Sequence, residues 1–273
     1  MFKEMLDNVR EKKPLIHNIT NYVTVNDCAN ILLACGASPI MSDEEKEVSE
    51  ITSICDGLNI NIGTLNERTV NSMIIAGKRA NELNHPIVLD PVGVGASSFR
   101  TETANKLLDN IKFTVIRGNI SEIKTLALGQ GNTRGVDADI SDSVTPENID
   151  KVINFLKEFS NKTKAVVAVT GAIDIVVYSN KAYCIYNGNS MMSCVTGTGC
   201  QLSAMITAYI TANINEPLQA TAAAICAMGL CGEKAYELLS EKDGNSSYRN
   251  YIIDAVYRLT SDELERGAKY ELR

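Results

Sequence analysis

The residues best suited to chemistry form a glycine-rich turn near the C-terminal third of the chain. Gly197 and Gly199 flank Thr198, and Cys200 follows at the start of a predicted helix. Because glycine leaves the backbone bare, successive amide N–H groups can point at one anion, and the helix dipole adds partial positive charge. The turn therefore suits a phosphoryl group in transfer. Taken alone, the motif is more typical of a glycine turn that binds nothing.

The turn matches neither common nucleotide-binding glycine motif. No Gly-Lys-Ser/Thr follows it, so it is not a Walker A loop. A dinucleotide fingerprint should follow the first strand, whereas this turn comes late in the chain.

A second polar group follows a predicted strand that ends at Arg117. Asn119 and Glu122 share a face on the first turn of a helix and can present oxygens to a hydrated Mg²⁺. The alternative is helix capping, with Asn119 as N-cap and Glu122 completing a capping box. Asp90 ends another buried strand, before Pro91, and places a carboxylate where it can support the same Mg²⁺. Its alternative role is to initiate a turn.

Short apolar runs alternate with longer helical patterns through the first two-thirds of the chain. The predicted strands are Leu15–Ile19, Ser38–Met41, Gly57–Ile62, Ile87–Pro91, Thr114–Arg117, Ala165–Thr170, Ile173–Tyr178 and Lys181–Tyr186. The predicted helices in this part are Asn26–Cys35, Glu44–Ile54, Asn66–Leu83, Thr101–Asn110, Ser121–Leu128 and Pro146–Phe159. Such alternation indicates an α/β fold with a mostly parallel central sheet flanked by helices on both faces.

The remaining segments complete a predicted single domain over residues 1–273. The run Asp174–Tyr186 reads as an antiparallel hairpin at one edge of the sheet. From Gly199 onward the pattern predicts helices only. These are Gly199–Ala212, Pro217–Leu239, Tyr248–Leu259 and Asp262–Gly267.

Polar and glycine-rich loops follow six of the predicted strands. Because ligands of open α/β sheets bind outside the carboxyl ends of the strands, we expect these loops to converge on one rim. The loops are residues 18–21, 41–43, 62–64, 90–95, 117–119 and 170–172.

The composition limits the classes of partner. With 273 residues, 45% hydrophobic and 22% charged, the chain is typical of a globular protein, and its net charge of −7 argues against general binding of nucleic acid or anionic membrane. The N-terminus lacks an apolar signal core, and the longest nearly apolar stretch, Ala220–Gly232, is too short to span a bilayer, so we expect a cytoplasmic protein. The eight scattered cysteines favour reduced, mostly buried thiols. We expect His17 to be a structural or rim hydrogen-bonding residue and His85 to lie in a surface loop.

Together these motifs resemble the hydroxyethylthiazole kinases of the ribokinase-like superfamily. An N-x-x-E motif after the central strands and a late G-x-G helix start are typical of the superfamily. The resemblance covers nearly the whole chain in the expected order. The residues that narrow it are Ile16–Val23 with Asn26, Ala29 and Asn30, then Gly36–Met41, Leu89–Ala96, Arg117–Asn119 with Glu122, Val169–Gly171 and Gly197–Cys200.

The resemblance implies Mg²⁺- and ATP-dependent phosphorylation of the hydroxyl of 4-methyl-5-(2-hydroxyethyl)thiazole, a step of thiamine salvage. Most relatives in the superfamily carry Asp as the base at the position of Cys200, whereas the thiazole kinases carry Cys. Cys200 would orient the hydroxyethyl group and accept its proton. Because a helix N-terminus lowers a thiol pKa, we expect a thiolate to be available there, though as a weaker base.

The resemblance also implies binding residues and an assembly. The positions matched to ATP contacts, or to the turn that holds its phosphates, are Arg117, Asn119, Thr170, Gly197, Thr198 and Gly199. The positions matched to the thiazole are Met41 and Gly197, with Thr20, Asn21 and Val23 near the rim. The resemblance implies a trimer whose thiazole sites lie at subunit interfaces, so we expect a homotrimer.

Four other functions compete with this interpretation. A kinase of hydroxymethylpyrimidine or another vitamin alcohol, or an ATP-dependent dehydratase that repairs hydrated nicotinamide cofactors, would share the fold, but the dehydratase should carry Asp at position 200. A non-catalytic nucleotide sensor would not need Asp90, Glu122 and the glycine turn together. A nicotinamide oxidoreductase lacks support because no glycine fingerprint follows the first strand.

Overall fold

The computed structural model describes residues 1–129 and 143–273 of the chain. The described strands form one nine-stranded sheet in the order β2-β1-β3-β4-β5-β6-β7-β8-β9. They are β1 (Leu15–Ile19), β2 (Ser38–Met41), β3 (Gly57–Asn61), β4 (Ile87–Asp90), β5 (Val115–Gly118), β6 (Val166–Val169), β7 (Asp174–Tyr178), β8 (Lys181–Ile185) and β9 (Tyr270–Leu272). Strands β2 to β6 in this order are parallel, and β7, β8 and β9 are antiparallel. The predicted mostly parallel sheet is confirmed.

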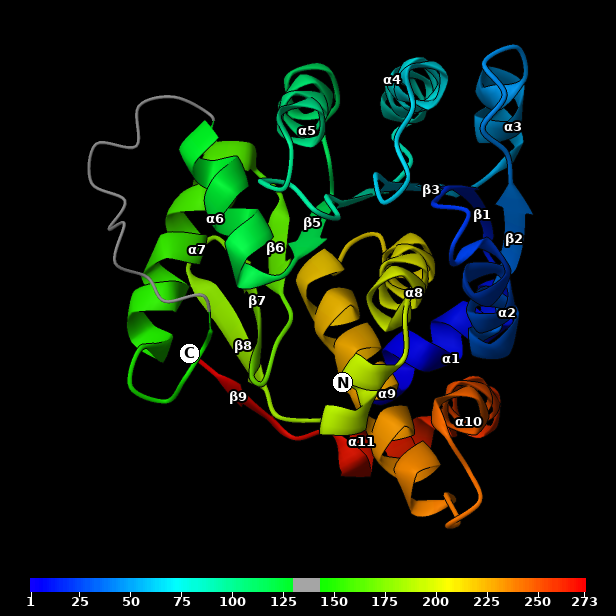
Figure 1. Ribbon diagram of the computed structural model, residues 1–273, viewed down its shortest axis with the longest axis vertical. Coiled ribbons are helices and arrows are strands. Elements are labelled where there is room, and N and C mark those ends of the chain that lie inside the picture. Colours follow the sequence, from blue (N-terminus) through cyan, green and yellow to red (C-terminus); the bar gives the residue numbers. More distant parts are fainter. Residues whose placement is uncertain (130–142) are drawn as a thin grey trace.

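Helices cover both faces of the sheet (Figure 1). The helices on one face are α3 (Val48–Ile54), α4 (Glu67–Glu82), α5 (Ser98–Asn110), α6 (Ile120–Gly129) and α7 (Ile149–Thr163). Those on the other face are α1 (Phe2–Lys12), α2 (Val25–Cys35), α8 (Thr198–Ala212) and α9 (Pro217–Glu237), with α10 (Asn245–Arg258) and α11 (Ser261–Gly267) packed outside them. A short 3₁₀ helix, η1 (Ser190–Cys194), precedes the glycine turn.

Neighbouring residues of one strand enter opposite hydrophobic cores. Val88 and Val115 pack on the side of α8 and α9, whereas Leu89 and Ile116 pack on the side of α4 to α7. Side chains alternate across a strand, so a strand buried on both faces needs an apolar residue at every position. This explains the continuous apolar runs from which these strands were predicted.

The parallel register brings six strand ends to one edge of the sheet. Asn18 of β1 lies beside Met41 of β2, and Asn61 of β3 lies beside Asp90 of β4. Helix α8, nearly all of whose residues are buried, packs against β3 and β4 on one face. The predicted convergence of the six loops on one rim therefore follows from the topology.

Two elements at the chain ends were not predicted. Helix α1 buries Phe2, Met5, Leu6 and Val9, a spacing typical of the apolar face of a helix. The charged residues between them make this pattern hard to see in the sequence. The expectation of helices only after Gly199 is wrong, because β9 pairs with β8. Strand β9, and not the β7–β8 hairpin, therefore forms the edge of the sheet.

Four helix starts differ from prediction by three residues or more. The helices predicted from Thr101 and Tyr248 begin earlier, at Ser98 and Asn245. The helix predicted from Glu44 begins at Val48, after a turn, and the helix predicted from Pro146 begins at Ile149. Helix ends are the least specific part of a sequence pattern because capping geometry, not apolar spacing, decides them.

Candidate active site

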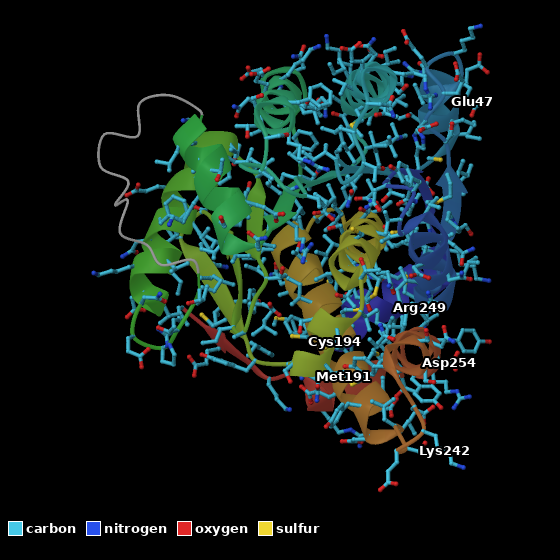
Figure 2. All side chains as sticks on the ribbon, in the orientation of Figure 1. Glu47, Met191, Cys194, Lys242, Arg249 and Asp254 are labelled. Atoms are coloured by element: carbon cyan, nitrogen blue, oxygen red, sulfur yellow. The ribbon has the colours of Figure 1, made fainter. Side chains whose placement is uncertain are left out.

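Two cavities open along the rim at the carboxyl ends of the parallel strands. The larger, of about 620 Å³, is lined by Arg117 of β5, by residues that follow β6 and β8, by η1, by the start of α8 and by part of α9. The smaller, of about 300 Å³, is lined by residues of and after β1, β2 and β3. Figure 2 marks η1 by Met191 and Cys194 and the wall of the smaller cavity by Glu47, well apart in this view. A third hollow, of about 550 Å³, lies at the amino ends of β4, β5 and β6 and holds none of the predicted site residues.

The glycine-rich turn begins α8, as predicted. Gly197 is the N-cap of α8 and has a φ of 86°, in the left-handed region that favours glycine. A Cβ at Gly197 would overlap the side chain of Thr24, and one at Gly199 would lie 2.6 Å from Arg117 Nη1. A side chain has no room at either position. Bare backbone therefore faces Arg117 at the first turn of α8.

Arg117 joins the larger cavity to the buried carboxyl of Asp90. Its Nη2 donates a hydrogen bond to Thr170 Oγ1, and its Nη1 lies 3.6 Å from Asp90 Oδ1. The Arg117 side chain is only 11% exposed, so water weakens its attraction for an anion less than at the surface. Arg117, Thr170, Thr198 and Gly199, all predicted to contact ATP, line the larger cavity together.

Cys200 lies between the two cavities. Its chain neighbour Gly199 lines the larger cavity, and its hydrogen-bond partner Asn61 lines the smaller one. The Cys200 Sγ accepts hydrogen bonds from Asn21 Nδ2 and from Asn61 Nδ2, both at 3.2 Å. The side chain is buried, with 9% of the residue exposed. Cys200 itself lines neither cavity, but these two neighbours place its sulfur next to both.

The expectation that the helix N-terminus lowers the thiol pKa is wrong. Burial raises the pKa of Cys200 above its usual value, and the nearby Asp90 carboxylate raises it further. The hydrogen bonds from Asn21 and Asn61 oppose the rise without cancelling it. Near neutral pH the sulfur therefore keeps its proton.

One carboxyl oxygen of Asp90 makes no hydrogen bond among the described residues, although Arg117 lies near it. Its Oδ2 accepts a hydrogen bond from Asn61 Nδ2 at 2.7 Å, whereas its Oδ1 has no hydrogen-bond partner in the described part of the chain. The residue is fully buried, and burial raises its pKa to about 6 despite the opposing attraction of Arg117. An unsatisfied buried oxygen of this kind suits a cation ligand.

Both oxygens of Glu122 bind backbone amides. Oε1 accepts a hydrogen bond from Gly93 N and Oε2 one from Asn119 N, both at 2.8 Å, while Asn119 Oδ1 accepts one from Glu122 N at 2.8 Å. The capping box weighed as the alternative is therefore present. Glu122 also ties the loop after β4 to the loop after β5. No three His, Cys, Asp or Glu side chains cluster as a metal site within residues 1–129 and 143–273.

Some of the predicted binding residues do not line a cavity. Met41 lines the smaller cavity, but Val23 is 58% exposed and lies outside its wall, where Tyr22 and Val25 stand instead. The exposed Asn119 lies outside the wall of the larger cavity, and its side-chain oxygen caps α6. Gly197 lies outside both walls and shapes the turn through its backbone.

Comparisons with known proteins identify the family. The family described as "Hydroxyethylthiazole kinase family" matches residues 6–262. This chain belongs to the hydroxyethylthiazole kinase family. A hydroxyethylthiazole kinase of Clostridium acetobutylicum is 68% identical over 271 residues, covering 99% of each chain. The solved structure of a hydroxyethylthiazole kinase protein from Pyrococcus horikoshii is 36% identical, with a TM-score of 0.88 over 100% of this chain and 98% of the other.

A more distant likeness places the family in its fold group. A ribokinase-like superfamily protein from Enterococcus faecalis matches with a TM-score of 0.60 at 12% identity, over 93% of each chain. At that identity only the fold is shared. The ribokinase-like fold expected from the sequence is thus confirmed. Within residues 1–129 and 143–273 no helix is long and apolar enough to cross a membrane.

Two polar residues of this family member's rim were missed from the sequence. Asn61 ends β3 and contacts both Asp90 and Cys200. Arg100 donates hydrogen bonds to the carbonyl oxygens of Ile62, Gly63 and Val92, each at 2.7 Å, and so joins the loops after β3 and β4. The signal available for Asn61 was a polar side chain near the end of the apolar run of the predicted strand Gly57–Ile62. Arg100 lies in a helix and carries no such signal.

The remaining expectations for histidine and cysteine are confirmed where the structure tests them. His17 is buried, with Nδ1 2.9 Å from Thr52 Oγ1 and Nε2 3.0 Å from the Ser42 carbonyl oxygen, a structural role. All eight cysteines are free thiols, and all except the exposed Cys194 are buried.

Proposed function

We propose that this chain transfers the γ-phosphoryl group of ATP to the hydroxyl of 4-methyl-5-(2-hydroxyethyl)thiazole. The observation that carries the proposal is the position of Cys200. It follows the glycine turn on the wall of a cavity of about 620 Å³ and is hydrogen-bonded to Asn61 on the wall of one of about 300 Å³. The first volume suits a nucleotide and the second a small ring compound. The family to which the chain belongs supports the same acceptor.

The larger cavity is proposed to hold ATP. Arg117 would offset phosphate charge, with Thr170 holding its guanidinium in place. The amides of Gly197, Thr198 and Gly199 would bind the γ-phosphoryl group at the start of α8. Asn119 supports the site through its capping bonds with Glu122.

The smaller cavity is proposed to hold the thiazole. Met41 lines it, and its backbone and that of Gly197 are the proposed contacts. Asn21 would act through Cys200, to which it is hydrogen-bonded. Val23, exposed beside the cavity, would reach the ligand only where a second subunit covers this face.

The proposed transfer depends on alignment more than on a strong base. The acceptor oxygen bonds to the γ-phosphorus while the bond from that phosphorus to the β–γ bridging oxygen breaks, and ADP leaves. The transition state of such transfers is loose, so the hydroxyl keeps its proton until late and then passes it to an oxygen of the transferred phosphoryl group. Because burial raises the Cys200 pKa, the sulfur serves to orient the hydroxyl. Its two amide partners hold it for that task.

The residues present fit a Mg²⁺ ion. Asp90 Oδ1 is buried without a hydrogen-bond partner among the described residues, and Glu122 lies in the next loop. Magnesium in phosphoryl-transfer sites typically needs only one or two carboxylates, the rest of its shell being water and phosphate. When bound, it would neutralise phosphate charge. Asp90 would be the direct ligand, and Glu122, whose oxygens hold two amides, would act through water.

We also propose that residues 1–273 act as one domain, in a cytoplasmic homotrimer with its thiazole sites at the subunit interfaces. All nine described strands share one sheet, which supports a single domain. Tyr22, 77% exposed, stands on the wall of the smaller cavity beside the exposed Val23, and such apolar exposure favours a covering partner. Light scattering at assay concentration tests the assembly, and a monomer would contradict shared sites.

A coupled assay of ADP release tests the proposed reaction. Hydroxyethylthiazole should release ADP only when ATP and Mg²⁺ are both present, and hydroxymethylpyrimidine should serve poorly. Preference for the pyrimidine would identify a sister kinase. ATP binding with no ADP release for any alcohol would indicate a nucleotide sensor.

A further inference from the structure

One buried side chain bridges the two groups on which the proposed transfer depends. Asn61 is the last residue of β3 and is 1% exposed. Its Nδ2 donates hydrogen bonds to Asp90 Oδ2 at 2.7 Å and to Cys200 Sγ at 3.2 Å. An amide nitrogen carries two protons, so one can serve each partner.

Backbone donors determine which way the Asn61 amide points. Asn61 Oδ1 accepts a hydrogen bond from Gly63 N at 2.8 Å, and a backbone N–H can only donate. The Asn61 oxygen must therefore face Gly63, which turns its nitrogen toward Cys200 and Asp90.

The same logic orients Asn21. Its Oδ1 accepts a hydrogen bond from Thr24 N at 3.1 Å, so its Nδ2 faces Asn61 Oδ1 at 2.9 Å and Cys200 Sγ at 3.2 Å. The sulfur is therefore held between two amide donors whose orientations the main chain sets. Neither amide can rotate without breaking these hydrogen bonds.

We propose that Asn61 is a positioning residue that holds the Cys200 sulfur and the Asp90 carboxylate in one fixed relation. This inference rests on the proposed function and deepens it. The acceptor hydroxyl must meet the phosphorus in line, and a misplacement of about 1 Å can cost about 100-fold in rate. A single amide that bonds to both groups prevents the alcohol side and the phosphate side from shifting independently. Asn61 itself needs no contact with substrate.

Strand β3 offers a matched control. Asn59 lies two residues earlier on the same face of the strand and is fully buried. Its Nδ2 donates to Asn18 Oδ1 at 3.1 Å and has no hydrogen bond to Cys200. Replacing Asn59 thus perturbs the same strand without removing a donor to the sulfur.

The first test inverts the donor without changing the shape. In Asn61→Asp an oxygen replaces the nitrogen that faces Asp90 and Cys200. We expect kcat for the thiazole alcohol to fall about 10- to 100-fold, a loss typical of partners that orient functional groups, with the KM for ATP within about threefold. A folded Asn61→Asp variant with kcat within threefold of wild type would overturn the donor role.

The second test uses Asn61→Ala, which introduces no charge, in a cycle with Cys200→Ala. If Asn61 acts through Cys200, the loss in kcat caused by Asn61→Ala should be at least about fivefold smaller in the Cys200→Ala background. Asn59→Ala should cause the same loss in both backgrounds. Equal losses for Asn61→Ala in both backgrounds would reduce Asn61 to a structural residue.

Failure of the proposed function remains distinguishable. If wild type releases no ADP with any alcohol, the same four proteins of the Asn61 and Cys200 cycle are unfolded in urea. Non-additive free energies of unfolding support the contact between amide and sulfur, and additive ones contradict it. The ADP-release assay thus tests the proposed reaction, and the unfolding cycle tests the role of Asn61.

Discussion

The two sides of Cys200 handle charge in opposite ways. The larger cavity presents the shielded guanidinium of Arg117 and the bare amides at the start of α8. The smaller cavity presents, in its depth, the neutral side chains of Asn18, Asn61 and Met41, with carboxylates only among its outer residues 43, 44 and 47. A triphosphate needs positive charge held away from water, whereas a neutral alcohol needs only direction. The larger cavity therefore serves charge compensation, and the smaller one serves alignment of the alcohol.

That separation predicts different kinetic signatures for damage on each side. Substitutions beside the larger cavity should raise the KM for ATP and lower turnover together. Substitutions beside the smaller cavity should lower turnover and leave ATP binding intact. Asp90 lies at the boundary, because it faces Arg117 through Oδ1 and Asn61 through Oδ2.

The largest effect is expected for Arg117→Met. The substitution removes the cation of the phosphate side and leaves the buried Asp90 without its ion-pair partner. We expect kcat/KM for ATP to fall by about 10³-fold, in the range found for a removed arginine or oxyanion donor. Initial rates over an ATP series measure this loss. Arg79→Met, which breaks a surface pair with Glu82, is the control. An unchanged KM for ATP in Arg117→Met would place the phosphates elsewhere.

A smaller and cleaner effect is expected for Cys200→Ser. The shorter Cβ–O bond draws the acceptor atom away from the amides of Asn21 and Asn61, so kcat should fall about tenfold while the KM for ATP stays the same. Cys200→Asp should retain activity, because a carboxylate accepts the same two hydrogen bonds. Steady-state rates for both variants decide, with the buried Cys231→Ser as the control. Wild-type behaviour of both Cys200→Ser and Cys200→Asp would remove the sulfur from the mechanism.

Sequence patterns predicted the phosphate side better than the alcohol side for a physical reason. Anion binding needs glycine and arginine at strand ends, and such residues stand out in a sequence, as Gly197, Gly199 and Arg117 do. The alcohol side relies on neutral asparagines. Asn61 is one of two asparagines in a predicted strand, and only the pairing of β3 with β4 places it beside Asp90.

The thiol pKa and the chain ends illustrate the same limit. A helix N-terminus is visible in a sequence, but the burial that outweighs it for Cys200 is a property of the packed fold. Strand β9 has only three residues, all exposed and too few for a clear pattern, so only its pairing with β8 reveals it. The tilted contact of its Tyr270 ring with the Phe2 ring of α1, with ring centroids 4.8 Å apart, joins the two ends of the chain and depends on both.

Glu122→Gln should change the Mg²⁺ requirement of the phosphate side and leave the alcohol side unaffected. Glutamine keeps one acceptor for Gly93 N or Asn119 N but turns a donor toward the other, and it removes the negative charge next to the proposed metal. We expect the Mg²⁺ concentration for half-maximal rate to rise about tenfold, a size typical for a supporting partner of a metal site. A magnesium titration measures it, with the exposed Glu82→Gln as the control. Superimposable titrations of Glu122→Gln and wild type would refute the assignment.

The smallest effect is expected for Asp174, a carboxyl on the wall of the larger cavity. Asp174 Oδ1 accepts a hydrogen bond from Gly171 N at 2.9 Å, and burial raises its pKa from 3.8 to about 7. The folded state therefore keeps a proton that the unfolded state has lost between these pH values. Ionising Asp174 costs stability, so its contribution is least unfavourable below about pH 4 and the full cost is present above about pH 7.

Asp174→Asn removes this cost while its side-chain oxygen still accepts from Gly171 N. The variant should be more stable than wild type at pH 8, by on the order of 1 kcal/mol because the cavity admits solvent, and the difference should vanish near pH 4. Urea unfolding at both pH values measures it. Asp254→Asn, on the outer helix α10 in Figure 2, should give no such pH-dependent difference. If the stability difference between Asp174→Asn and wild type persists at pH 4, packing and not charge would explain the gain. The Asp174 carboxylate would then no longer count as a buried negative charge on the side that must attract phosphate.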